Sequence, residues 1–257
     1  MIAAGIDVGL RHIKIVIVND KQIAASCMGV SGGERRPDAV KAIWNSALGL
    51  AGVAASDVSR IVATGQGKFD AGFADSKVVE PVADACAARF LSPGVTSVID
   101  VGADQMRVIA LGKESGVDEI SFQQKCSAGL GVFLEYIARR LGLTIEELSS
   151  LPPDAHGGSA VNDGCPVFAE LGALELLNRR VPVTQVAGAV IQAIAVRMNA
   201  IINDKVAPAA DSTMLIGGVS KNAAIVHALK MRSGIDFIIP EQAEYAGALG
   251  AALLAYE

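Results

Sequence analysis

The sequence has few aromatic residues, few histidines and no cluster of basic residues, and each of these absences argues against a class of protein. Of the 257 residues, 4% are aromatic and 3 are His, and 22 Lys and Arg stand against 27 Asp and Glu, for a formal net charge of −5. Surfaces that bind nucleic acid rely on clustered Lys and Arg, so we expect no nucleic-acid partner. His12, His156 and His227 are scattered singly and indicate no histidine metal site.

Long apolar runs are also missing. We find no stretch of the roughly 18 apolar residues that a membrane span needs. The opening segment 1–14 carries an acid and a polar turn too early for a signal peptide. We therefore expect a cytoplasmic protein with no membrane partner. In that compartment, four cysteines are more typical of thiols or metal ligands than of disulfides.

Small and aliphatic side chains, by contrast, are abundant. Hydrophobic residues make up 51% of the chain, which is enough to fill a core and leaves little room for disorder. Because so few of them are aromatic, the many Ala, Val, Ile and Gly residues favour close packing of helices on a sheet. The length fits one large domain or two small ones.

The pattern of apolar residues predicts a mixed α/β fold. In the first part of the chain it predicts strands at 2–8, 13–20, 21–30 and 59–64 and helices at 38–52 and 81–91. The first three strands are expected to be joined by tight turns, the first two as an antiparallel pair. Asp38 is the expected N-cap of the first helix, and Gly52 lies near the end of that helix.

The chain then repeats its opening. VTSVIDVGAD (95–104) repeats IAAGIDVG (2–9), and MRVIALGK (106–113) mirrors IKIVIVND (13–20). In both places an apolar run is followed by Asp, one residue and Gly, and then by a second apolar strand. We therefore predict two related lobes. Their predicted bounds are 1–94 plus 241–257 for the first lobe and 95–240 for the second.

The second lobe is expected to be richer in helices. Its predicted helices lie near 129–141, 144–150, 166–178, 183–204 and 221–231, its strands at 213–219 and 236–240, and a loop rich in Pro, Gly and Asp at 152–164. A closing helix at 244–255 has small residues suited to tight packing.

Three glycine-bearing phrases, GIDVG (5–9), IDVGAD (99–104) and IGGVSKN (216–222), have the character of a nucleotide site. Glycine lets backbone amides approach a phosphate without a Cβ in the way, and an Asp at the end of a strand can hold Mg²⁺ through water. Asp7 and Asp100 occupy matching places in the two lobes. The pair Gly217–Gly218, after a buried strand, would let an adenosine lie against the backbone.

The order of these loops resembles that of the actin, sugar-kinase and Hsp70 ATPase superfamily. Within it, the chain resembles the activators of 2-hydroxyacyl-CoA dehydratases and the ATPase subunits of benzoyl-CoA reductase, the BadF/BadG/BcrA/BcrD type. The resemblance covers essentially the whole chain. It is carried by GIDVG (5–9), ATGQG (63–67), VIDVGAD (98–104), KCSAGLGVFLE (125–135), CPVFAE (165–170), IGGVSKN (216–222) and PEQAEYAGALGAALLA (240–255). The implied fold is two related ribonuclease-H-like lobes with a nucleotide cleft between them.

The cysteine phrases are the specific part of this resemblance. In the family each subunit supplies two cysteines to one 4Fe–4S cluster held between two subunits, and Cys126 and Cys165 match those positions. A helix beginning just after Cys126 would direct its amides at the cluster. The resemblance further implies that ATP binding moves the lobes and drives one low-potential electron to a partner acyl-CoA reductase or dehydratase, with a ferredoxin as donor.

The resemblance and the glycine phrases together give a set of candidate site residues. The catalytic candidates are Asp7, Asp100, Asp104 and Gln105; the nucleotide-binding candidates are Gly9, Arg11, Lys14, Gly102, Gly129, Gly217, Gly218 and Asn222; the metal ligands are Cys126 and Cys165.

The chain departs from the family pattern in both phosphate loops. Leu10 and Arg11 follow Gly9, where the family usually has a hydroxyl residue, and Ala103 replaces the second glycine of the second loop. Arg11 would serve there as a phosphate clamp or lie at the surface of the turn. Such changes resemble those of the smaller D-type subunit of benzoyl-CoA reductase. Two readings stay open: an active homodimeric ATPase, or a degenerate subunit paired with a catalytic one.

Two functions outside electron transfer also fit parts of the sequence. A small-metabolite or sugar kinase of the same superfamily would use Asp100 as general base, but it would leave the cysteine phrases unexplained. A nucleotide-sensing scaffold subunit would make the cysteines dispensable. Cys126 and Cys165 would then be ordinary small apolar residues, as we expect for Cys27 and Cys86.

Overall fold

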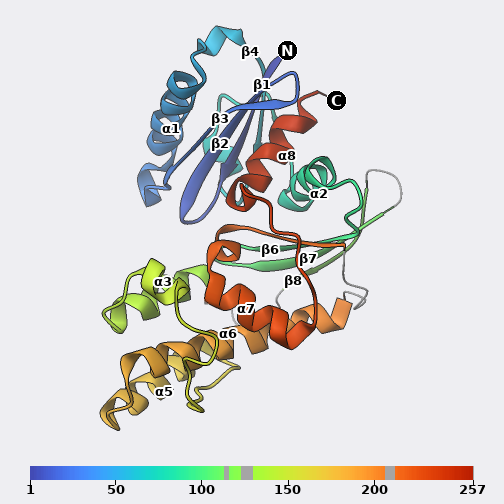
Figure 1. Cartoon of the computed structure of the whole chain (residues 1–257). Helices are drawn as coiled ribbons and strands as arrows, with labels where there is room; N and C mark the ends of the chain where they lie inside the picture. Colours follow the sequence, from blue (N-terminus) through green and yellow to red (C-terminus); the bar gives the residue numbers. More distant parts are fainter. Residues whose placement is uncertain (113–115, 123–129, 206–211, 257) are drawn as a thin grey trace. The chain divides into compact units, whose positions relative to one another are not determined.

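The computed structural model describes residues 1–112, 116–122, 130–205 and 212–256, with the side chains of 204 and 205 left aside (Figure 1). Candidate residues Cys126 and Gly129 lie outside the described residues, as does Lys125. The described part is a mixed α/β structure with two sheets, as the apolar pattern predicted.

The first sheet has five strands in the order β3-β2-β1-β4-β5. Their bounds are β1 Ile2–Val8, β2 His12–Asn19, β3 Gln22–Val30, β4 Val58–Thr64 and β5 Ser76–Lys77. The first three strands form an antiparallel meander, and β4 returns parallel to β1. β1 and β2 are buried along most of their length, so the sheet is covered on both faces.

The second sheet has four strands in the order β8-β7-β6-β9. Their bounds are β6 Ser97–Val101, β7 Met106–Leu111, β8 Val117–Phe122 and β9 Thr213–Ile216. This order repeats that of the first sheet: third strand, second, first, then a strand reached by a long crossover. The predicted duplication is therefore visible in the topology.

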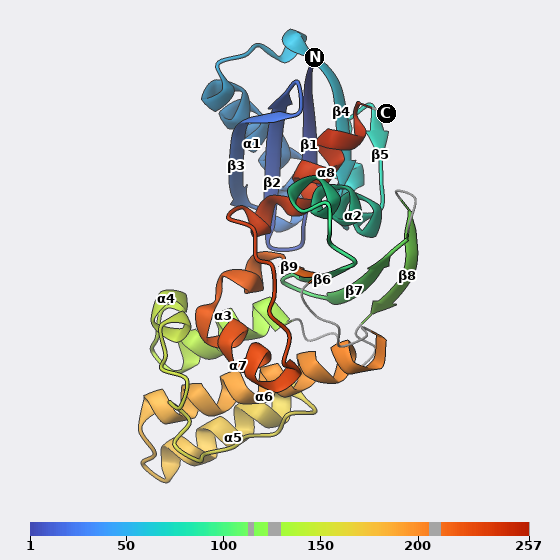
Figure 2. The same cartoon turned by 45° about the vertical axis from the view of Figure 1, so that its right-hand side comes forward.

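Three helices belong to the first sheet: α1 Arg36–Ala51, α2 Glu80–Leu91 and α8 Ala246–Leu254. α1 packs Ile43, Trp44 and Leu48 against the sheet. α8 lies against the other face of the sheet, with α2 beside it (Figures 1 and 2). A Cβ at Gly5 would collide with Ala248 O, and one at Gly250 would collide with Ala83 O. Glycines thus set the close approach of α8 to β1 and α2, the tight packing that its small residues predicted.

The other helices are α3 Leu130–Arg140, α4 Ile145–Ser149, α5 Pro166–Asn178, α6 Val183–Lys205 and α7 Ala223–Ser233. Short 3₁₀ helices lie at Gly33–Arg35, Ala55–Asp57, Lys68–Asp70, Gly218–Lys221 and Ala243–Tyr245. One core joins residues of α3 and α6 to residues of β6, including Ile99, Phe133 and Ile194. The segment Val183–Asn203 of α6 is long and apolar enough to cross a membrane by length and composition alone, a run that inspection of the sequence overlooked. A share of 61% of that segment is buried inside the fold, as in core helices.

Contacts divide the chain into two units, each with its own core. The first unit comprises Met1–Val98, Leu111–Glu119 and Glu244–Glu257, and the second comprises Ile99–Ala110 and Ile120–Ala243. The division runs through β6, β7 and β8 of the second sheet.

Two local expectations from the sequence were wrong, and one strand was not predicted at all. Asp38 is not the N-cap of α1; Arg35 is, with no side-chain cap, and Asp38 lies in the first turn because the helix starts earlier, with Pro37 in its first turn. Residues 236–240 form only an isolated bridge between Ile238 and Met214. The strand β8 was not foreseen, since its sequence VDEISF carries three acidic or hydroxyl residues. Gly52 does end α1, in the left-handed conformation at φ 67.

Candidate functional site

The first candidate turn joins β1 to β2. The Gly9 N–H donates to His12 O at 3.1 Å and leaves Leu10 and Arg11 at the tip, both exposed. A Cβ at Gly9 would lie 2.8 Å from His12 O, so this position requires glycine. The buried hydroxyl of Ser31 donates to Gly9 O at 3.1 Å, which holds the turn from the neighbouring segment.

A carboxylate and a cation stand beside this turn. Asp7 and Lys14 are direct cross-strand partners in the register of β1 and β2. The Lys14 Nζ lies 2.9 Å from Asp7 Oδ2, and the two side chains are 17% and 15% exposed, Lys14 first. The pair is therefore mostly buried but still accessible to solvent. Partial burial strengthens electrostatic interactions with a charged ligand that reaches it.

The strand next to β1 ends in a glycine that faces the same carboxylate. Gly65 follows β4 at φ +90, and a Cβ there would lie 2.5 Å from Val8 O and 2.6 Å from Asp7 Oδ1. Both the positive φ and the close approach require glycine. A second carboxylate, Asp84 of α2, is also near: a Cβ at Gly247 would lie 3.4 Å from Asp84 Oδ1 and 3.7 Å from Asp7 Cγ. Asp84 is 3% exposed.

The second candidate turn has the same construction. The Gly102 N–H donates to Gln105 O at 3.0 Å, which leaves Ala103 and Asp104 at the tip. Arg107 donates from Nε to Asp100 Oδ2 at 3.1 Å, and its Nη2 makes a second, shorter bond to the same oxygen. The side chains of Arg107 and Asp100 are 13% and 10% exposed.

The glycine after β9, Gly217, corresponds to Gly65 after β4. Gly217 has φ +88, and a Cβ there would collide with Val101 O and lie 2.5 Å from Asp100 Oδ1. Thus each unit holds an Asp at the end of its central strand, a cation seven residues later on the same hairpin, and a positive-φ glycine packed on that Asp from the neighbouring strand. Such a carboxylate beside turn amides can hold a hydrated divalent cation or face a phosphate.

The first turn of α3 packs against the second candidate turn. Val132 N donates to Ala103 O at 3.0 Å, and a Cβ at Gly131 would lie 2.9 Å from Ala103 Cα. Ala103, which replaces the family's second glycine, therefore sits where the backbone is already fixed by α3. Asp104 is half-buried and Gln105 is exposed.

The last glycine phrase, IGGVSKN (216–222), contains an open backbone position and a helix cap. Around Gly218 there is open space, with no atom within 4 Å of an added Cβ, which leaves room for a flat ligand on the backbone. Asn222 instead caps α7: its Oδ1 accepts from the Ile225 N–H at 3.0 Å, and the residue is 7% exposed. This contact alone accounts for an Asn at that position.

Cys165 lies at the N-cap of α5 and is partly exposed. Pro166 follows at the first helical position, and no side-chain hydrogen bond caps this turn. The backbone N–H of Cys165 donates to Asn162 Oδ1 at 2.8 Å. A thiolate here would lie at the positive end of a helix dipole, which stabilises negative charge. The position therefore fits a ligand of an anionic metal cluster.

The described residues do not contain a complete metal site by themselves. Among them, no group of three or more His, Cys, Asp or Glu side chains is arranged to hold a metal ion. A four-thiolate cluster would need Cys126, which the described ranges leave out, and ligands from a second chain.

Two tyrosines, Tyr245 and Tyr136, have raised pKa values. Burial, followed by the negative charges of Glu244 and Cys27, raises the pKa of Tyr245, while Lys14 opposes the change. The hydrogen bond from Tyr136 to Glu170 is the main cause of the raised pKa of Tyr136; its oxygen lies 2.6 Å from Glu170 Oε1.

Sequence reasoning named most of the residues at the two turns and overlooked three. Arg107, Gly65 and Asp84 were not among the candidates. The signal for Arg107 was available, because Lys14 and Arg107 stand at the same distance along the chain from Asp7 and Asp100. Asp84 was visible as a lone acid in the apolar stretch PVADACAA. Gly65 belonged to a phrase already quoted, ATGQG.

Comparisons with known proteins agree on one family. Residues 4–255 match the model of the BadF/BadG/BcrA/BcrD ATPase family. The chain is 32% identical to an activator of lactoyl-CoA dehydratase from Anaerotignum propionicum, over 100% of this chain and 98% of the relative. It is 28% identical to the D-type component of benzoyl-CoA reductase from Thauera aromatica, over 98% of this chain and 92% of the relative.

A solved structure shows the same fold. The activator of the 2-hydroxyisocaproyl-CoA dehydratase from Clostridium difficile, with bound ADPNP, superposes with a TM-score of 0.86 at 26% identity, over 100% of this chain and 94% of that one. The family match spans nearly the whole chain, and relatives of both the activator and the reductase type are matched over most of their length. The chain belongs to the BadF/BadG/BcrA/BcrD ATPase family.

Proposed function

We propose that this protein is an ATP-dependent electron-transfer subunit that serves a partner acyl-CoA reductase or dehydratase. The observation that carries the proposal is the family match over residues 4–255 together with a partly exposed thiol, Cys165, at the N-cap of α5. The names of the relatives, activators of acyl-CoA dehydratases and a component of benzoyl-CoA reductase, support the class of partner. We expect this work to take place in the cytoplasm.

The nucleotide would be bound by the two turns and the glycine phrase after β9. The backbone amides at the tips of the turns that follow Gly9 and Gly102 would face phosphate oxygens, and Lys14 would add a positive charge. Asp7 and Asp100 would hold the hydrated Mg²⁺ that accompanies ATP. The adenosine would lie on the backbone at Gly217 and Gly218, where Gly218 has open space around it. Arg11, exposed at the tip of the first turn, would contact a phosphate.

Hydrolysis needs a group that orients water. Asp104 and Gln105, at and beside the tip of the second turn, are the proposed candidates. Leu10 has no hydroxyl to offer a phosphate or a water, and the Ala103 carbonyl accepts a hydrogen bond from Val132 of α3. The chain is therefore either a complete ATPase or a nucleotide-binding subunit whose partner turns over ATP, and the assay below separates the two.

The cluster would be held by Cys165 and Cys126 of each of two chains. When bound, a 4Fe–4S cluster supplies one electron at low potential. The N-terminal turn of α5 stabilises the negative charge of the thiolate at Cys165, and Asn162 fixes the backbone at that residue. The proposed partners are a second ATPase-type subunit, the same or a related chain, and a ferredoxin as electron donor.

The nucleotide part of the proposal is tested by ATP turnover. We expect Asp7→Asn and Asp100→Asn each to lower Mg²⁺-dependent ATP hydrolysis by about 100-fold, because each removes a charge that positions the metal. Asp38→Asn is the matched control, since Asp38 is an exposed acid in α1. Unchanged turnover in both site variants would contradict the proposed site.

ATP binding is measured in parallel by calorimetry on the same proteins. Binding of Mg·ATP by the wild-type chain without turnover would assign hydrolysis to the partner subunit and keep the proposal. Absence of nucleotide binding would overturn it.

A further inference from the structure

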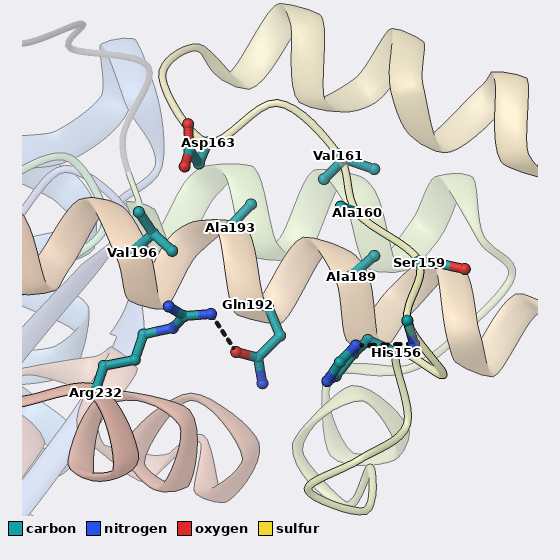
Figure 3. A pocket seen from close by; sticks show the side chains of 11 residues that line it. His156, Ser159, Ala160, Val161, Asp163, Ala189, Gln192, Ala193, Val196 and Arg232 are labelled. Atoms are coloured by element: carbon teal, nitrogen blue, oxygen red, sulfur yellow. Dashed lines mark hydrogen bonds between the residues drawn. The ribbon is translucent and has the colours of Figure 1, made fainter.

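A cavity of about 240 Å³ lies within the second unit, lined by none of the residues of the two turns. Figure 3 shows it between the loop before Cys165, helix α6 and helix α7. The polar residues at its edge come from all three elements: His156, Ser159 and Asp163 from the loop, Gln192 from α6 and Arg232 from α7.

Hydrogen bonds orient the donors along one side of this cavity. Arg232 Nη2 donates to Gln192 Oε1 at 2.8 Å. Because the oxygen of Gln192 is engaged there, its NH₂ group is left as the end that can meet a ligand. Figure 3 shows Gln192 between Arg232 and His156.

The imidazole of His156 is oriented in the same way. Its Nδ1 accepts the N–H of Gly158 at 3.2 Å, so the neutral ring carries its proton on Nε2. The guanidinium of Arg232, the amide of Gln192 and the Nε2–H of His156 are therefore three donors from three separate elements. A wall that offers donors, one of them permanently charged, is suited to an anion.

The other residues that line the cavity indicate which kind of anion it could bind. Ala189, Ala193 and Val196 of α6, with Ala160 and Val161 of the loop, form an apolar floor. Asp163 lies on the opposite side of the cavity from His156 (Figure 3), where its negative charge disfavours a second anionic group. The volume is below that of pockets for drug-sized ligands, about 300 Å³ and more.

We infer that this cavity binds a small monocarboxylate with a short apolar body. The carboxylate meets Arg232, Gln192 and His156, and the alkyl group lies on the alanine and valine floor of α6. The site is independent of the proposed nucleotide and cluster functions, since none of its residues belongs to them.

The inference is tested with isobutyrate as probe on the purified full chain, by calorimetry and by NMR titration. We expect saturable binding of isobutyrate and at least tenfold weaker binding of isobutyramide, which has the same shape without the charge. Arg232→Gln should weaken isobutyrate binding at least tenfold. Arg179→Gln, an exposed arginine outside the cavity, should leave it unchanged.

A second variant blocks the cavity without touching the donors. Ala160→Phe places a large side chain at an exposed lining position and should abolish binding while thermal unfolding stays as in the wild type. Isobutyrate binding that survives both Arg232→Gln and Ala160→Phe would overturn the inference. Absence of saturable binding would also overturn it, as would tighter binding of inorganic phosphate than of isobutyrate at this site.

Discussion

At the scale of single residues, each unit has a carboxylate paired with a cation on the same hairpin. The pairs are Asp7 with Lys14 in the first unit and Asp100 with Arg107 in the second. Both side chains of the second pair are nearly buried. A buried carboxylate that loses its partner keeps its desolvation cost and loses the compensating attraction. Each pair thus fixes its carboxylate in place, and removing either member alone should cost stability.

We predict that Arg107→Met lowers the free energy of unfolding by about 3–5 kcal/mol, measured by urea denaturation. The double variant Asp100→Asn with Arg107→Met should recover part of this loss, because no unpaired charge remains. Arg35→Met is the control, since its pair with Asp38 is 85% and 68% exposed and should contribute less than about 1 kcal/mol. Equal losses for Arg107→Met and Arg35→Met would contradict this account of the pair.

Tyr136 gives a prediction about pH. Its pKa is raised from the ordinary 10.0 because its hydroxyl donates to the Glu170 carboxylate. A raised pKa favours the protonated form in the folded protein, so the contribution of Tyr136 to stability is complete below about pH 10 and is lost as pH rises through the folded-state pKa. Glu170→Gln should lower the pKa of Tyr136.

The measurement is an alkaline titration of the tyrosinate absorbance, with Tyr136→Phe used to assign the transition among the three tyrosines. Wild type should ionise Tyr136 at higher pH than the Glu170→Gln variant. The same midpoint in both proteins would show that the hydrogen bond is not the cause.

At the scale of elements, the packing of α8 against β1 and α2 depends on glycines, because a side chain at these positions would collide with the neighbouring backbone. The contact of Gly250 with Ala83 O leaves no room for a Cβ, whereas Gly49 of α1 has open space around it. We predict that Gly250→Ala lowers the free energy of unfolding by about 1–3 kcal/mol. The matched change Gly49→Ala should raise it by up to about 1 kcal/mol. Thermal and urea unfolding measure both, and a neutral Gly250→Ala would show that α8 shifts without cost.

Most elements followed from local patterns, and the exceptions have identifiable causes. The strand-rich opening and α5 were predicted nearly to the residue, because apolar periodicity is a local signal. The expected strand at 236–240 is reduced to one bridge, since its partner β9 spans only Thr213–Ile216. The N-cap of α1 was misplaced because Pro37 allows the helix to start before Asp38.

At the scale of the whole molecule, the repeat of Asp-x-Gly indicated two related lobes, and both sheets have the corresponding strand order. The candidate residues close in sequence to that repeat were predictable. The packing of Gly65 and Gly217 on the two acids was not predictable, because strands from distant segments become neighbours only in the folded sheets. The roles of Cys126 and Cys165 came from resemblance to a family rather than from spacing.

The measurement that tests the central claim most directly is iron and acid-labile sulfide analysis of anaerobically purified protein, with native mass determination of the assembly. The account predicts about four irons per two chains, loss of this iron in Cys126→Ser and Cys165→Ser, and its retention in the controls Cys27→Ser and Cys86→Ser. Iron-free wild-type protein under strict anaerobiosis, or full iron content in both site variants, would contradict a cluster shared between two subunits.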